Sequence, residues 1–114
     1  MSTTEIPTVI TRYQQAEQDA DWTALADCFL PEGVAFDEGR THVGREEIAA
    51  WRTAVAAAVT FTSTVVERRA LGADGFKLVL RLEGDFPGGV AELDFLFALR
   101  DERIAALVIL PASA

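Results

Sequence analysis

The stretch "RYQQAEQDADWTALADCFLPEGVAFD", residues 12–37, is the most informative part of this chain about its fold. Its first part belongs to an apolar stripe at three- and four-residue spacing, which predicts a helix over residues 7–19 with Tyr13 on its inner face. Its last part alternates between apolar and other residues, as a half-buried strand does, and ends in the carboxylate of Asp37. The stretch therefore predicts helical structure followed by a strand with an acid at its end.

A second, short helix is predicted between these two parts. Asp21 is a good N-cap, because its carboxylate can accept hydrogen bonds from the first free backbone N–H groups. Trp22, Leu25 and Phe29 continue the apolar stripe, and the sequence "LPEG" that follows them ends the helix. Two helices are thus expected before the strand that ends at Asp37.

The rest of the chain contains one more helix and then only strands. After a loop through His42, an alanine-rich helix is predicted over residues 45–59, with the charges of its first turn, including Arg45, in solvent. From residue 60 the apolar period changes to two, which predicts four strands. These strands cover residues 61–71, 76–83, 90–100 and 104–110. Short turn sequences separate them, so we expect an antiparallel meander.

This order predicts an α+β fold in a single domain, residues 1–114. The three N-terminal helices are expected to pack on a curved antiparallel sheet and to enclose a pocket, as in a cone. A chain of 114 residues, half of them apolar and a quarter charged, can bury its own core. The expected architecture is therefore one globular unit with a cavity at its open end.

Charge and composition exclude several classes of partner. The net charge of -8 disfavours binding to nucleic acids and to anionic membranes. No window approaches the roughly 20 apolar residues of a membrane span, and the N-terminus has no basic segment before a long apolar run. We expect a cytoplasmic protein that binds neither nucleic acid nor membrane.

The two residue types most common in zinc sites are nearly absent. Cys28 and His42 are the only cysteine and the only histidine, so a zinc site of nitrogen and sulfur ligands cannot be assembled. Counting these residues leaves a magnesium or calcium site made only of carboxylates open, but no acidic loop has the spacing of a calcium-binding one, so we expect no metal site. Cys28 is interpreted as a small core residue and His42 as a residue at a surface or pocket rim, although a nucleophilic pair of the two stays open as an alternative.

Three segments together resemble a known group of proteins. The stretch at residues 12–37, "GREEIAAW" at residues 44–51 and "LRDERIAALVI" at residues 99–109 resemble the NTF2-like superfamily, in particular its SnoaL-like and ketosteroid isomerase-like members. The most specific part is the combination of a tyrosine in the first helix, an aspartate at the end of the first strand, and Gly-Arg-Glu at the start of the third helix. The resemblance implies the cone fold, an apolar small-molecule ligand and a homodimer.

The resemblance also implies three catalytic residues. By position, Tyr13 would donate a hydrogen bond to the substrate oxyanion and Asp37 would move the proton. Asp94 on a late strand, kept neutral, would be a second oxyanion donor. A proton next to a carbonyl group is only weakly acidic, so a base needs such preorganised donors. This set would work without a metal or a cofactor.

Each of these residues also has a structural interpretation. Tyr13 can be a core aromatic residue, and Asp37 can be a turn residue before Glu38 and Gly39. Asp94 lines the pocket only if its face of the strand looks inward; if the aromatic face does, Asp94 lies in solvent or in a dimer interface. Four further residues are predicted to line the ligand pocket, the first three of which can also be core residues: Trp22, Phe29, Trp51 and Leu96.

Two functional hypotheses remain. One is a cofactor-free ketosteroid isomerase-like or polyketide cyclase-like enzyme, which abstracts a proton next to a carbonyl group of a hydrophobic small molecule. The other is a non-catalytic NTF2-like domain for small-ligand binding or dimerisation, in which the same residues only line the cavity. The fold alone cannot separate the two, because one fold can carry many functions.

Overall fold

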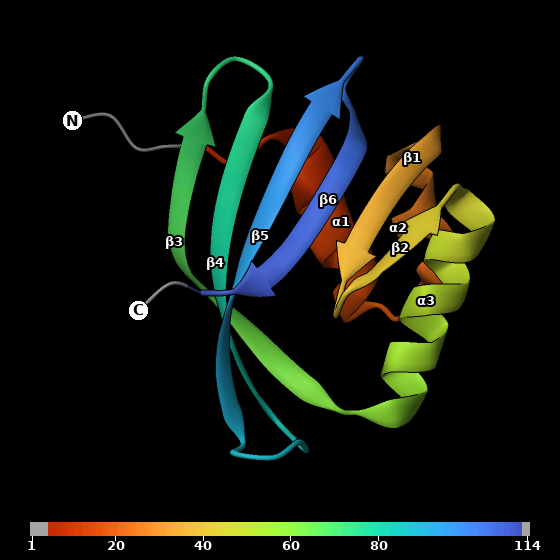
Figure 1. The fold of residues 1–114 in the computed structure, drawn as a ribbon. Helices are drawn as coiled ribbons and strands as arrows, with labels where there is room; N and C mark the ends of the chain where they lie inside the picture. Colours follow the sequence, from red (N-terminus) through yellow and green to blue (C-terminus); the bar gives the residue numbers. More distant parts are fainter. Residues whose placement is uncertain (1–4, 113–114) are drawn as a thin grey trace.

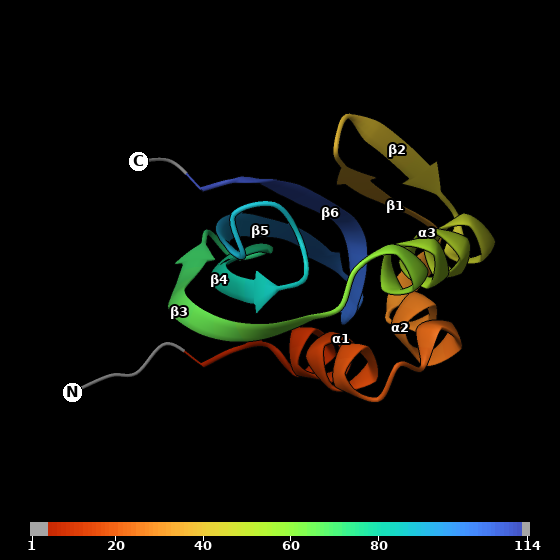
Figure 2. The same cartoon turned by 90° about the horizontal axis from the view of Figure 1, so that it is seen from below.

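The computed structural model describes residues 5–112. It confirms the α+β arrangement: three helices lie along one side of a strongly curved, open sheet (Figures 1 and 2). The helices are α1 (Thr8–Gln18), α2 (Trp22–Asp27) and α3 (Arg45–Ala58). The strands are β1 (Phe29–Asp37), β2 (Arg40–Val43), β3 (Phe61–Leu71), β4 (Gly75–Gly84), β5 (Val90–Arg100) and β6 (Arg103–Pro111).

The helices form where their caps and apolar stripes predict them. The Asp21 carboxylate accepts a hydrogen bond from the Ala24 backbone N–H at 3.0 Å, as an N-cap does. On α1 the buried residues include Ile10 and Tyr13, which face the inside of the sheet. Within residues 5–112, no helix is both long enough and apolar enough to cross a membrane.

The sheet contains the predicted meander and two features that the periodicity did not indicate. Its strand order is β2-β1-β6-β5-β4-β3, and β3 to β6 pair antiparallel in sequence. However, the segment with His42, predicted as a loop, is strand β2, and β1 pairs with β6 in parallel. The prediction that α2 extends through Phe29 is also wrong, because α2 ends at Asp27 and Phe29 begins β1.

Strand β1 is interrupted near its start. Phe29 is opposite Ile104 of β6 and Val34 is opposite Ala106, so β1 has several more residues than β6 between these two pairs. Gly33 lies in this bulge, where an added Cβ atom would be 3.0 Å from the Leu30 carbonyl oxygen. The close approach of the backbone segments therefore favours a glycine at this position.

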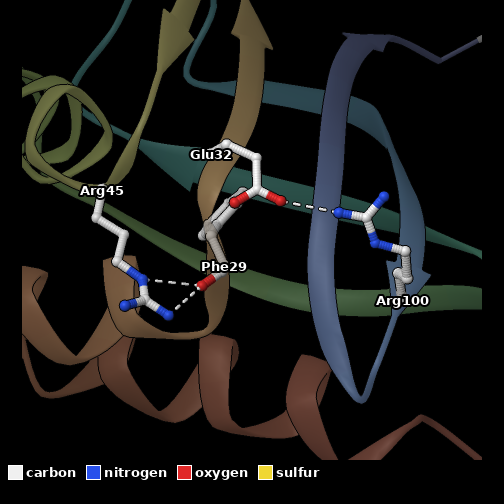
Figure 3. Close-up of polar contacts among 4 residues, drawn as sticks. All are labelled: Phe29, Glu32, Arg45 and Arg100. Carbon is white, nitrogen blue, oxygen red and sulfur yellow. Dashed lines mark hydrogen bonds and ion pairs between the residues drawn. The ribbon is translucent and has the colours of Figure 1, made fainter.

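Two arginines reach β1 from opposite sides, as Figure 3 shows. The Nε and Nη2 atoms of Arg45 donate hydrogen bonds of 2.9 and 2.7 Å to the backbone carbonyl of Phe29. Arg100 forms an exposed ion pair of 2.8 Å with Glu32. The expectation that the charge of Arg45 lies in solvent is therefore wrong: the side chain holds the start of α3 against the start of β1.

We expect Arg45→Met to lower the free energy of unfolding by about 1.5–3 kcal/mol, because it leaves the Phe29 carbonyl without its two charged donors. Arg100→Met is the matched control, since it removes an exposed ion pair to the same strand and should lower the free energy of unfolding by less than about 1 kcal/mol. Urea unfolding of both variants measures the difference. Equal losses for the two variants would contradict the role assigned to Arg45.

The core lies between the helices and the concave face of the sheet. Its largest fully buried side chains include Phe29, Leu25 and Ile48 from the N-terminal half and Leu78 and Leu107 from the sheet. On β5, Phe95 and Phe97 point into this core. The concave face of the meander is thus the apolar one, and this orientation decides which β5 residues reach the cavity.

Candidate functional site

A cavity of about 480 Å³ lies between α1, α3 and the concave face of the sheet. Most of its wall consists of apolar side chains of α3 and the strands, among them Val55, Phe61, Leu82, Leu93, Phe95 and Ile109. Polar or charged side chains also line the wall, among them Tyr13, Glu17, Asp37 and Arg52. This combination of an apolar wall and a few convergent polar groups is typical of small-molecule sites.

A second hollow of about 580 Å³ lies on the outside of the molecule. It is lined largely by charged side chains of α1, α2 and the turn between β5 and β6, such as Asp19, Asp27 and Glu102. Neither Tyr13 nor Asp37 borders it. The smaller, apolar cavity is therefore the candidate site.

The carboxylate of Asp37 is held in place at the end of β1. Its Oδ2 atom accepts a hydrogen bond of 3.2 Å from Nε1 of Trp51 on α3. The Trp51 ring stacks on His42 of β2, with 5.4 Å between the ring centroids. The second carboxylate oxygen is not engaged by Trp51. The hairpin of β1 and β2 and helix α3 thus orient Asp37 at the cavity wall.

The phenol of Tyr13 is buried on α1, with 3% of the residue exposed. Its ring packs edge-on against Phe29 and Phe97, at centroid distances of 6.1 and 5.8 Å. Burial raises the pKa of Tyr13 well above its ordinary value; the positive charge of Arg52 lowers it, and nearby acids, Glu17 first, raise it further. The hydroxyl is therefore a protonated hydrogen-bond donor at neutral pH.

The stability of the protein should fall above pH 10 because of Tyr13. An unfolded tyrosine loses its proton near pH 10, whereas the buried phenol has a raised pKa. Below about pH 10 both states carry the proton and Tyr13 adds no pH dependence. Above it the unfolded state binds fewer protons, so the free energy of unfolding falls by up to about 1.4 kcal/mol per pH unit.

Urea unfolding between about pH 8 and pH 11 tests this expectation. Tyr13→Phe removes the only tyrosine of the chain, so the variant should lack this part of the decline. The steeper fall in the free energy of unfolding with rising pH should appear in the wild type alone. Parallel curves for the two proteins would show that Tyr13 is not buried as described.

Asp94, predicted as the second oxyanion donor, does not meet Tyr13 and Asp37 in the cavity. Its neighbours Leu93 and Phe95 line the cavity, so Asp94 points to the opposite face of the sheet. There its carboxylate lies 3.9 Å from Nζ of Lys77. Leu96 lies on the same outer face and does not line the cavity either. Burial of the aromatic side chains of β5 determines this orientation.

The three aromatic residues predicted to line the pocket lie behind its wall instead. Phe29 is fully buried against the Tyr13 ring. Trp51 holds Asp37, and Trp22 lies beneath the guanidinium group of Arg52, whose central carbon is 5.3 Å from the ring centroid. None of the three is among the residues that line the cavity. They support the polar groups of the wall rather than forming its surface.

Sequence reasoning missed the ion pair between Glu17 of α1 and Arg52 of α3. Both residues line the cavity, and Nη2 of Arg52 donates to Oε2 of Glu17. Arg52 is only 5% exposed. A signal was present: Glu17 lies four residues after Tyr13, on the same helical face, and a buried charge is rare unless it is paired. The partner in α3 could not be identified from spacing.

The alternative of a nucleophilic pair is not supported. The Cys28 thiol donates to the Ala24 carbonyl at 3.5 Å, and burial raises its pKa. His42 stacks on Trp51 instead of contacting Cys28. Across residues 5–112, no group of three or more His, Cys, Asp or Glu side chains is arranged to hold a metal ion.

Comparison with known proteins gives a family and a fold. The family model of the SnoaL-like domain matches residues 2–74. A candidate polyketide cyclase from Sinorhizobium meliloti is 30% identical, with a TM-score of 0.86, over 92% of this chain and 95% of its own. No curated protein matches the sequence.

Two more distant structures share the fold. A Catenulispora acidiphila protein with a ketosteroid isomerase-like fold, solved in complex with trimethylamine, is 22% identical, with a TM-score of 0.83, over 95% of this chain and 88% of its own. A computationally designed 17-OHP binder is 16% identical, with a TM-score of 0.75. The match covers 91% of this chain and 90% of the binder. At these identities the likeness concerns the NTF2-like cone fold alone.

Proposed function

The chain belongs to the SnoaL-like domain family, and we propose that it is a cofactor-free enzyme that removes a proton next to a carbonyl group of an apolar small molecule. The reaction would be of the ketosteroid isomerase-like or polyketide cyclase-like type. The observation that carries the proposal is that Tyr13 and Asp37 line one cavity whose remaining wall is mostly apolar.

Asp37 would be the general base. Its carboxylate takes a proton from the carbon next to the carbonyl group. The electron pair of that C–H bond becomes a C=C bond, and the π pair of the C=O bond moves onto the oxygen, which gives an enolate. In an isomerase, the protonated Asp37 then returns the proton to another carbon of the same molecule. In a cyclase, the enolate carbon attacks a second carbonyl group of the same molecule and forms a C–C bond, and the alkoxide that results takes the proton back from Asp37. The hydrogen bond from Trp51 keeps the carboxylate in one orientation.

Tyr13 would stabilise the enolate oxygen. Its phenol is protonated at neutral pH and fixed by the packing of Phe29 and Phe97, so it is a preorganised donor. The hydrogen bond from such a donor strengthens most when negative charge develops on the acceptor inside a site that excludes water. The apolar side chains around it favour a substrate with a hydrophobic body, and the volume of about 480 Å³ lies in the range of ligand pockets.

The test is a proton-transfer assay with two substrates. Isomerisation of a β,γ-unsaturated ketosteroid is followed by the ultraviolet absorbance of the conjugated enone, and exchange of the protons next to the carbonyl of 2-tetralone in D2O is followed by NMR. We expect a rate at least about 100-fold above buffer for one of them, the minimum typical of a positioned base. Buffer rates for both, together with saturable binding of the ketones, would favour the non-catalytic ligand-binding domain instead.

A further inference from the structure

Arg52 is a buried cation in the wall of the cavity that contains Tyr13 and Asp37. Such a charge is unfavourable unless it is paired and hydrogen-bonded, and Arg52 has one ionic partner, Glu17. Two tryptophan rings complete its surroundings: the central guanidinium carbon lies 5.3 Å from the ring centroid of Trp22 and 5.1 Å from that of Trp51. The guanidinium group is therefore fixed in position before any ligand binds.

The guanidinium group has more donors than its protein partners use. It carries five N–H bonds. Nη2 donates to Glu17, while Nε is buried and has no hydrogen-bond partner within residues 5–112. The Nε atom has almost no accessible surface, so a ligand oxygen in the cavity would accept from the Nη groups of Arg52 rather than from Nε.

We propose that Arg52 binds an oxygen atom of the ligand, so that the cavity selects neutral apolar molecules with a ketone or phenol oxygen. This inference rests on the proposed function, because the same oxygen would become the enolate oxygen, with Arg52 beside Tyr13 in the place that Asp94 was expected to take. Arg52 and Tyr13 lie within electrostatic range of each other, since the guanidinium charge influences the phenol.

The charges of the wall favour a neutral ligand over a carboxylate. Glu17, Asp37 and Glu38 are acids, and Arg52 is the one basic residue among the described residues that line the cavity. A molecule with a permanent negative charge would meet these acids, whereas a ketone becomes charged only after Asp37 has taken its proton. The Glu17–Arg52 pair thus suits an oxygen whose charge appears during the reaction.

Direct binding tests the proposal independently of catalysis. Three naphthalene probes differ only in the group at position 2: 2-naphthol, 2-methylnaphthalene and 2-naphthoate. Affinities are measured by fluorescence titration for Glu17→Gln and for Glu17→Gln/Arg52→Met, so that the partly buried carboxylate of Glu17 is not left without a partner. The two variants differ only in the guanidinium group.

We expect the double variant to bind 2-naphthol about 10- to 100-fold more weakly than Glu17→Gln, the effect of a hydrogen bond to a charged group. The affinity for 2-methylnaphthalene should change by less than about threefold, because this probe has no acceptor. The wild type should bind 2-naphthol more tightly than 2-naphthoate. Parallel losses for 2-naphthol and 2-methylnaphthalene, or no loss for either, would overturn the proposal.

A measurement on the wild type avoids any effect of the variants on folding. In NMR spectra of the 15N-labelled protein, 2-naphthol should shift the Arg52 N–H resonances downfield, and 2-methylnaphthalene should not. Equal shifts with both probes would contradict the proposal. If the proton-transfer assay fails but these binding differences appear, Arg52 is a ligand-binding residue and the proposed catalysis is wrong. If catalysis is found but the binding differences between the probes are absent, the role proposed for Arg52 is wrong.

Discussion

Asp37→Asn is expected to lower the rate of proton transfer by about 10²- to 10⁴-fold, the contribution typical of a positioned general base. Asparagine has nearly the shape of aspartate, and its amide oxygen can still accept the hydrogen bond from Trp51. The change therefore removes the basic oxygen and leaves the cavity wall in place. The loss should appear in kcat, with a much smaller change in KM.

Asp74→Asn is the matched control. Asp74 is an exposed residue at the turn between β3 and β4 and does not line the cavity. The same substitution there should leave the rate within about twofold of the wild type, as surface changes away from the site usually do. A decrease of less than about tenfold for Asp37→Asn would mean that the carboxylate lines the cavity without acting as the base.

Tyr13→Phe is expected to lower the same rate by about 10²- to 10³-fold, the range found when one oxyanion donor is removed. The edge-on packing against Phe29 and Phe97 needs only the ring, which phenylalanine keeps. The fold should therefore be retained, and the change in rate reports the hydroxyl group itself. The decrease should affect kcat and kcat/KM equally, because the hydrogen bond strengthens only as the enolate forms.

Thermal unfolding at pH 7 is the control for Tyr13→Phe, because a variant with an intact core should melt close to the wild type. A folded variant with wild-type turnover would assign Tyr13 to the core alone. A variant that loses both its melting transition and its activity would show that the hydroxyl is needed for folding, contrary to the packing described.

Much of the fold could be predicted from the local pattern. The apolar stripe of α1, the N-cap at Asp21 and the change to a period of two after residue 60 are all properties of neighbouring residues. They led to helices and strands whose ends mostly agree within a residue. The exceptions are β2, which was predicted as a loop, and Phe29, which fits the stripe of α2 and is assigned to β1 only by its pairing with Ile104.

The candidate site was predictable only in part. Tyr13 and Asp37 stand at the inner face of a predicted helix and the end of a predicted strand, and the structure brings them to one cavity. Asp94 has an equally suitable residue type, but β5 turns its other face inward. Arg45 and Arg52 resemble ordinary charged residues of a helix surface, yet one binds the Phe29 carbonyl and the other pairs with Glu17 in the cavity wall.

The order of the elements, the apolar character of their faces and two of the polar residues in the cavity can all be predicted from the amino-acid pattern. The pattern does not indicate which face of β5 lines the cavity, that β1 pairs with β6 in parallel, or which acid pairs with Arg52. Periodicity describes only neighbours along the chain. Strand pairing and ion pairs join residues far apart in sequence, and their choice depends on how all the apolar faces can be buried together.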